Sequence, residues 1–160
     1  TRYLSKIYND NWMRENQYFE QTLNILASEV VESKKRRREG LLSIPLATAV
    51  QDAVSLMREH AISQIPIIES ESVVGSISEA RILDVLISDP AARKKPVAEY
   101  MEEPFPVLPE DAPINMVAEH MKENTTAVLV RMGRGFDIIT KSDLILFLTR
   151  LQSISEDPLR

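Results

Sequence analysis

The sequence predicts an α/β fold: two copies of one strand-helix-strand-strand-helix unit, packed as a pseudo-two-fold pair and preceded by a helical linker. Two observations predict the duplication. Met121 lies 64 positions after Met57, each in an apolar helical stripe, and Thr140 lies 62 positions after Ser78, each where an apolar strand meets a helix. The offset therefore drifts by only two residues. One such unit leaves apolar surface exposed when it folds alone, so we expect the two copies to pair.

Composition limits the class of protein. The chain has 160 residues, 44% of them hydrophobic and 27% charged, which suits one ordinary domain or two small ones. A net charge of −5 argues against a nucleic-acid partner. Without cysteine, disulfides, thiol catalysis and thiolate metal sites are excluded. No apolar run has the length of a membrane span and no signal peptide is visible, so we expect a cytoplasmic protein. Because the sequence begins with Thr1 rather than Met, we expect a fragment.

Residues 1–40 form the first segment. Five aromatic residues fall within its first nineteen positions, which predicts a surface that packs against another part of a larger protein. A helix is expected over residues 23–31, ending in the basic run of residues 34–38. Cations favour a helix C-terminus by about 0.3–1 kcal/mol at exposed positions. No stacking aromatics accompany the run, so we interpret it as a solvated helix end rather than a nucleic-acid site.

The repeats follow in order. In the first copy, a helical stripe over residues 50–61 precedes apolar strands at 65–68 and 73–78 and a helix at 82–86. In the second copy the same elements are expected at 114–121, 127–130, 138–140 and 144–148. A Pro-rich connector lies between them. We therefore divide the chain into a linker (1–40), a first repeat (41–90), a second repeat (91–150) and a tail (151–160).

The stretch IITKSD at residues 138–143 ends a strand and begins a helix. Thr140 at the N-cap and Asp143 three positions later form a capping box, in which each side chain satisfies a backbone N–H. The same geometry permits a second interpretation. Amide groups and the helix dipole attract an anion, and an outward-turned Asp143 accepts hydrogen bonds from both hydroxyls of a ribose. From these residues alone, both interpretations stay open.

The duplicated order, together with the motifs SQIP at 63–66, GSIS at 75–78 and IITKSD, resembles a tandem of CBS domains, the Bateman module. The resemblance covers roughly residues 41–150. It implies a regulatory module that binds an adenosine-containing effector, such as AMP, ATP or S-adenosylmethionine, in a cleft between the repeats.

The resemblance also implies which residues bind. In it, Asp143 takes the ribose hydroxyls and Thr140 the phosphate, the backbone beside Ile65 reads the adenine edge, and Ile138 and Leu42 form apolar walls. The full predicted set is Leu42, Ile62, Ser63, Gln64, Ile65, Ile138, Thr140, Lys141 and Asp143.

The second cleft departs from the pattern. Its helix begins with Ser78 and has Arg81 where the family has aspartate, and arginine cannot accept a hydrogen bond. We therefore expect Ser78 to act only as a helix cap and Arg81 to be solvated or paired, which leaves one binding site. Asp137 replaces a family glycine and is expected to narrow the approach to Thr140. Ser63 offers no carboxylate to an ammonium, so the sequence does not choose among the effectors.

The words RYLSK at 2–6 and NDNWM at 9–13 resemble the end of the catalytic domain in bacterial enzymes of the cystathionine β-synthase type. That resemblance implies a parent enzyme carrying pyridoxal phosphate, with this chain as its C-terminal regulatory part and the catalytic domain as partner. Neither a lysine-bearing strand motif nor a Gly/Ser-rich phosphate loop occurs here. We therefore expect no catalytic residue, metal or cofactor in this chain.

Other candidate groups have simpler interpretations. His60 and His120 are expected at helix ends, without the converging partners that catalysis or zinc requires. Four methionines are expected in the core, namely Met57, Met101, Met116 and Met121. Four acidic residues among the prolines are expected to be solvated, namely Glu102, Glu103, Glu110 and Asp111.

Two functional alternatives remain beside the effector-binding module. The module can be a ligand-free dimerisation scaffold of its parent, and a homodimer is expected in either case. The remaining alternative, an enzyme in its own right, lacks any nucleophile–base pair in the sequence.

Overall fold

The computed structural model describes residues 24–34, 41–121 and 125–156, the last five without their side chains. The chain divides into two compact units: residues 39–106, and residues 1–38 together with 107–160. Each unit is described by itself. The expected aromatic surface, the words at 2–13, and the remainder of the basic run fall outside the described residues.

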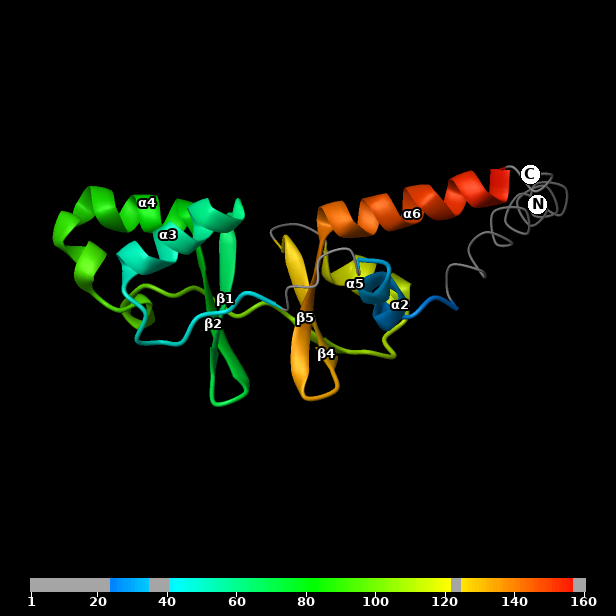
Figure 1. Cartoon of the computed structure of the whole chain (residues 1–160), viewed down its shortest axis with the longest axis horizontal. Coiled ribbons are helices and arrows are strands. Elements are labelled where there is room, and N and C mark those ends of the chain that lie inside the picture. The colour runs from blue at the N-terminus through cyan, green and yellow to red at the C-terminus, as the bar shows by residue number, and fades with distance from the viewer. Residues whose placement is uncertain (1–23, 35–40, 122–124, 157–160) are drawn as a thin grey trace, which may run out of the picture. The chain divides into compact units, whose positions relative to one another are not determined.

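In the unit of residues 39–106, helices α3 (Val50–His60) and α4 (Glu79–Ser88) lie beside a two-stranded hairpin of β1 (Gln64–Glu69) and β2 (Ser72–Ser78) (Figure 1). The strands are antiparallel, and Ile44 adds a parallel bridge to Ile67 of β1. Two short 3₁₀ helices, η1 (Pro90–Lys94) and η2 (Val97–Glu99), return the chain to the hairpin. There the backbone of Glu102 pairs with Ser76 of β2.

The core of this unit follows from the sequence periodicity. Helix α3 buries Val50, Ala53 and Met57, which recur at helical spacing on one face. It ends at Ala61, whose left-handed backbone (φ 52°) stops the helix. The buried cluster of the unit comprises Ile44, Val50, Ala53, Met57, Ile65, Ile67, Ile77, Ile82 and Val97.

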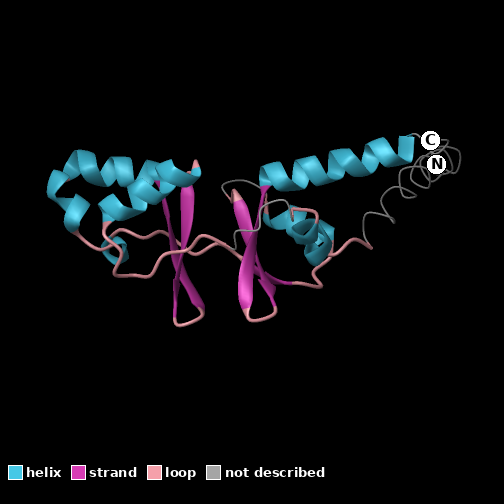
Figure 2. Ribbon diagram, in the orientation of Figure 1, coloured by secondary structure: helices cyan, strands magenta, loops and turns pink. Residues whose placement is uncertain are grey.

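In the other unit, β3 (Val107–Pro109), β4 (Ala127–Met132) and β5 (Gly135–Thr140) form one sheet in that order. Strand β3 is parallel to β4, and β4 is antiparallel to β5. Helix α5 (Ile114–His120) follows β3, and α6 (Lys141–Glu156) begins directly after β5 (Figure 2). The buried cluster comprises Ala27, Val30, Val31, Leu108, Ala112, Ile114, Val117, Met121, Val128, Val130, Ile139 and Leu144.

Helix α2 (Ala27–Glu32) precedes the first repeat in sequence but belongs to the unit of the second repeat. Backbone bonds fix it there: the N–H of Ala27 donates to the carbonyl of Ala112 at 2.8 Å, and the N–H of Ile114 donates to the carbonyl of Ile25 at 2.9 Å. Val30 and Val31 are buried against β4 and β5. The linker helix is therefore an integral part of the second repeat's core.

The first repeat is completed in the same way by the chain that follows it. Ala49, just before α3, bridges Pro96, as Pro113 before α5 bridges Leu26. In both units, therefore, the residue before the longer helix (α3 or α5) pairs with the residue before a shorter one (η2 or α2).

The α/β class and the two repeats are confirmed. In the first repeat the strand expected before α3 is reduced to the single bridge of Ile44 to Ile67, whereas the other predicted strands and helices are present. Two expectations about the core are wrong: Met101 and Met116 are 38% and 41% exposed. The sequence pattern divides the repeats at residue 90, whereas the compact unit continues to residue 106. Helix α6 also continues to Glu156, into the expected tail.

Candidate functional site at the start of helix α6

Thr140 and Asp143 form the predicted capping box. The N–H of Asp143 donates to Thr140 Oγ1 at 3.1 Å, and the N–H of Thr140 donates to Asp143 Oδ2 at 2.9 Å. The arrangement arises because the β-branched run of β5 ends where helical spacing begins, which leaves the first helical N–H groups in need of acceptors. Asp143 is therefore turned toward its own helix start, as the simpler sequence interpretation expects.

Another backbone N–H at this helix start already has a hydrogen-bond acceptor. The N–H of Lys141 donates to the carbonyl of Thr126 at 3.2 Å. Of the first three N–H groups of α6, those of Lys141 and Asp143 thus have acceptors already. The same pattern holds at α4, where the N–H of Glu79 donates to the carbonyl of Ser63 at 2.9 Å. A phosphate at α6 would therefore depend more on side-chain cations than on these amides.

Lys34 closes the carboxylate from the other side. Its ammonium lies 2.8 Å from Asp143 Oδ2 and also donates to the carbonyl of Ile138. The two side chains are 22% and 24% exposed. The sequence interpretation of the basic run as a solvated helix end is wrong for Lys34, because the buried face of α2 directs this side chain onto β5 and α6.

The ionisation of Asp143 follows from these contacts. Burial alone would raise the pKa of the carboxyl, but the hydrogen bonds from Lys34 and Thr140, with the positive charge of Lys34, outweigh it and hold the pKa below its ordinary value. Both contacts are made by Oδ2. Oδ1 has no hydrogen-bond partner among the described residues, so the carboxylate retains acceptor capacity.

The outer edge of β5 is closed at Ile138. Its N–H donates to Asp137 Oδ1 at 2.8 Å, and its carbonyl accepts from Lys34. Asp137, which replaces a family glycine, thus binds its own strand. Side chains thus satisfy both backbone groups of Ile138, which hinders strand addition at this residue.

The corresponding start of α4 confirms that Ser78 is a cap. Ser78 Oγ accepts from the N–H of Arg81 at 3.1 Å and donates to the Glu102 carboxylate at 2.6 Å. Arg81 Nε donates to the carbonyl of Tyr100 at 3.0 Å, so Arg81 is paired as expected. Glu102 is exposed, as expected, and its carboxylate also accepts this bond from Ser78.

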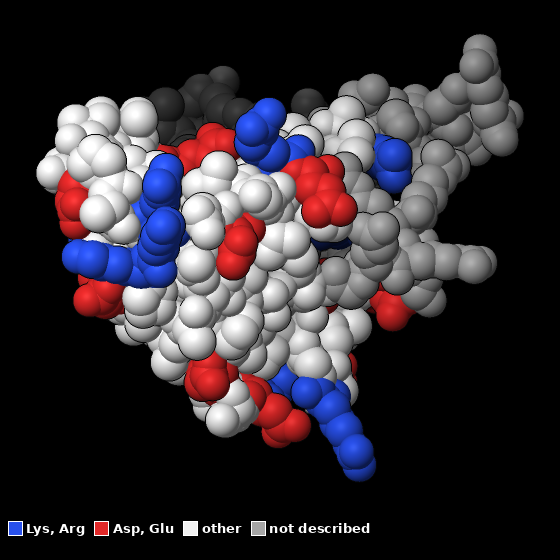
Figure 3. All heavy atoms as spheres, turned by 60° about the vertical axis from the view of Figure 1, so that its left-hand side comes forward, with Lys and Arg blue, Asp and Glu red and all other residues white. Residues whose placement is uncertain are grey.

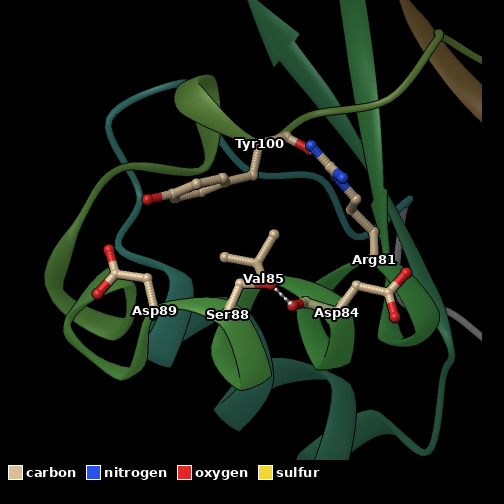
Figure 4. A pocket seen from close by; sticks show the side chains of 6 residues that line it. All are labelled: Arg81, Asp84, Val85, Ser88, Asp89 and Tyr100. Carbon is tan, nitrogen blue, oxygen red and sulfur yellow. Dashed lines mark hydrogen bonds between the residues drawn. The ribbon is translucent and has the colours of Figure 1, made fainter.

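A shallow hollow of about 270 Å³ lies beside α4. Figure 4 shows the ring of Tyr100 across from Val85, with Arg81 turned toward the Tyr100 carbonyl and Ser88 bonded to Asp84 within the helix. Asp89 completes the lining and pairs with Lys95. Arg81 is bonded to a backbone carbonyl and Asp89 to Lys95, so the hollow offers no set of groups suited to one ligand.

The remaining predicted residues belong to the unit of residues 39–106, whereas Ile138, Thr140, Lys141 and Asp143 belong to the other unit. Ile65 is fully buried, so its side chain serves the core. Leu42 and Ile62 are half-buried, and Ser63 is exposed with its carbonyl bonded to Glu79. Gln64 begins β1 opposite Ser78. The predicted binding residues are thus divided between the two units, and each unit fixes the positions of those it contains.

The described surface in Figure 3 carries charges of both signs. Lys and Arg are interspersed with Asp and Glu among the described residues of the face in Figure 3, in keeping with the net charge of −5. Within residues 24–34, 41–121 and 125–156, no three His, Asp or Glu side chains converge as metal ligands. No helix in these ranges is both long and apolar enough to span a bilayer.

Two α/β repeats, each with a capped helix start after its last strand, define a duplicated fold. The model of the CBS domain matches residues 37–88 and again 97–150. The chain therefore belongs to the CBS domain family and is a pair of such domains, which confirms the resemblance noted in the sequence. Pairs of this kind are commonly regulatory and ligand-binding.

Solved structures agree with this fold. A protein with CBS domains from Burkholderia ambifaria superposes with a TM-score of 0.68 at 16% identity, over 79% of this chain and 95% of that one. A CBS domain-containing protein of unknown function from Bacillus anthracis gives 0.66 at 17% identity, over 82% and 97%. At these identities the likeness shows the fold alone.

A curated relative places a similar segment in a larger protein. The A-adding tRNA nucleotidyltransferase of Geobacter sulfurreducens is 27% identical over 132 residues, which is 79% of this chain. The match spans only 15% of that protein's length.

Sequence reasoning missed the two closing contacts, Lys34 on Asp143 and Glu102 on Ser78. Lys34 lies within a run of five cations, and nothing in the sequence of the run marks Lys34 as half-buried.

Proposed function

We propose that this CBS pair is a regulatory module that binds an adenosine-containing effector, such as AMP, ATP or S-adenosylmethionine, and modulates an attached enzyme. The observation that carries the proposal is the Asp143 carboxylate. It is ionised, held at a helix start by Thr140, and retains Oδ1 as an acceptor among the described residues.

The chemistry of that carboxylate suits a sugar diol. A carboxylate that accepts from two hydroxyls makes charge-assisted bonds of roughly 1.5–3 kcal/mol each. Lys141 and the start of α6 supply positive potential for a phosphate. The half-buried Ile138 beside them supports the proposed apolar wall for the purine.

Calorimetry tests the proposal. With AMP, ATP and S-adenosylmethionine as titrants, we expect at least one to bind, and Asp143→Asn to weaken that binding at least tenfold, about 1.4 kcal/mol. Asparagine can still accept from Thr140, so the helix cap is retained. Asp111→Asn is the matched control, because it removes the same charge from an exposed turn and is expected to leave binding unchanged. Equal affinity in wild type and Asp143→Asn would remove Asp143 from the site.

We also propose that the attached enzyme is of the cystathionine β-synthase type, with bound pyridoxal phosphate. The support is the resemblance of residues 2–13 to the end of that catalytic domain. The relative from Geobacter carries its matching segment in a different class of enzyme, a tRNA nucleotidyltransferase. The test is made on the longer protein that contains this chain: retained pyridoxal phosphate and formation of cystathionine or cysteine, with and without effector. A longer protein without the cofactor would contradict this assignment.

A second candidate function is a ligand-free dimerisation scaffold. Leu83 and Ile87, one turn apart on α4, are 60% and 72% exposed, and Ile145 and Leu146 on α6 are 65% and 52% exposed. Apolar side chains in such numbers on two helices indicate protein contact. The closed capping box of Asp143 also favours this candidate.

A further inference from the structure

Lys34 forms a side-chain clasp on the proposed binding carboxylate. Its ammonium joins Oδ2 of Asp143, at 2.8 Å, to the backbone carbonyl of Ile138. Lys34 and Asp143 are 109 positions apart in sequence, so the contact ties the linker to the last helix of the module.

Helix α2, which precedes Lys34, is fixed to the rest of its unit. Ala27 and Ser28 donate their N–H groups to the carbonyls of Ala112 and Glu110 at 2.8 and 2.9 Å. Two valines of the helix are buried beneath it. Lys34 follows directly after this helix, with its own N–H bonded to the last of these valines. The ammonium is therefore delivered to Asp143 by a short, packed helix.

The corresponding place in the other unit is closed differently. There Glu102 covers the start of α4, and its backbone makes two bonds to Ser76, at 3.1 and 2.7 Å. Ser76 and Ile138 are equivalent, 62 positions apart, as are Ser78 and Thr140. At α4 the contact comes from the Glu102 side chain, whose backbone is itself paired with β2, whereas at α6 it comes from the end of the long Lys34 side chain.

The clasp conflicts with recognition of a diol. Two hydroxyls need both oxygens of Asp143, and Lys34 occupies Oδ2. We propose that Lys34 is a built-in competitor at this site, and that a bound adenosine displaces its ammonium and loosens the end of α2. The proposal rests on the proposed function and adds its regulation: occupancy of the site is converted into a change in the linker.

The magnitude follows from the exposure of the pair. Partly exposed ion pairs are weak, so removing the ammonium should tighten adenosine binding by about two- to tenfold. The reciprocal effect is the same in size, because the clasp and the ligand share one free-energy cycle.

The test uses the full chain, neutral adenosine as the probe, and Lys34→Met, which keeps an apolar stem and removes the charge. Lys95→Met is the matched control, because it breaks a Lys–Asp ion pair with Asp89 in the other unit. Calorimetry should show two- to tenfold tighter binding in Lys34→Met only. Hydrogen exchange at the amides of residues 30–34 should quicken in wild type on saturation with adenosine, and in Lys34→Met without it.

Binding of adenosine that is unchanged or weaker in Lys34→Met overturns the competitor role while leaving the proposed function in place. Unchanged exchange at residues 30–34 in the saturated wild type overturns the release of α2. Absence of adenosine binding to both proteins overturns the competitor role, and absence of binding of AMP, ATP and S-adenosylmethionine as well removes the proposed function.

Discussion

Oxygen Oδ2 of Asp143 accepts from two donors of different kinds, the amide of Thr140 and the ammonium of Lys34. The first contact stabilises the start of α6, and the second joins the linker to it. Asp143 is the third helical residue of the capping box and satisfies the N–H of the N-cap residue Thr140, so this one carboxylate matters to folding as well as to the proposed binding.

The stability of the chain should therefore depend on the ionisation of Asp143. Its pKa in the folded state lies below the ordinary value of 3.8. The carboxylate thus contributes stability that is fully present above the unfolded pKa and is lost as pH falls through the folded pKa. Denaturant unfolding of wild type and Asp143→Asn should show wild type more stable at pH 7, with the difference shrinking below about pH 4.

The comparison with asparagine isolates this group from other carboxylates, which titrate in both proteins alike. A difference in the free energy of unfolding that stays constant from pH 7 to pH 3 would show that the charge of Asp143 does not stabilise the fold.

At the scale of elements, β2 depends on a close approach of backbone at Gly75. A Cβ placed there would lie 3.0 Å from the carbonyl oxygen of Glu102 and 2.8 Å from the Sδ of Met101. The Met101 side chain can turn away, since it is 38% exposed, but the Glu102 backbone is paired with Ser76. The glycine thus admits the segment that closes the start of α4.

Gly75→Ala should destabilise the protein by about 1–3 kcal/mol, because the pairing of Glu102 with β2 has to shift. Gly135→Ala in β5 is the matched control. A Cβ added at Gly135 would meet nothing within 4 Å, and we expect a neutral effect or up to about 1 kcal/mol of stabilisation. Chemical denaturation measures both, and equal effects of the two substitutions would contradict the proposed close packing.

The elements were predictable where local pattern decides them. The apolar spacing of α3 and α5, the β-branched runs and the Thr140–Asp143 box each depend on neighbouring residues in the sequence. The position of α2 was not predictable, because its partners are Ala112 and Ile114, more than eighty positions away. The contact of Lys34 with Asp143 depends on that placement and was missed for the same reason.

At the scale of the whole molecule, the exposed apolar residues of α4 predict self-association. If Leu83 and Ile87 form a dimer contact, Ile87→Glu should weaken the dimer at least tenfold, because a charge would be buried in an apolar interface. Ser55→Glu, on the exposed face of α3, is the control and should leave association unchanged. Sedimentation equilibrium over a range of concentrations measures both.

A wild type that stays monomeric throughout that range would argue against the scaffold function. A dimer that persists in Ile87→Glu would place the contact elsewhere. Repeating the measurement with bound effector separates the two candidate functions, since only the effector-binding module requires an affinity for adenosine.

The packing of α2 on the second repeat has a consequence for the order in which a ribosome releases the chain. Val30 and Val31 emerge before the first repeat, but Ile114, against which their helix is fixed, follows Val31 by 83 positions. At roughly 5–20 residues per second, that interval is on the order of 4–17 s. During this interval the first repeat can already fold. Val30 and Val31 stay exposed in the nascent chain over the same time, and exposed apolar side chains of this kind are what chaperones bind.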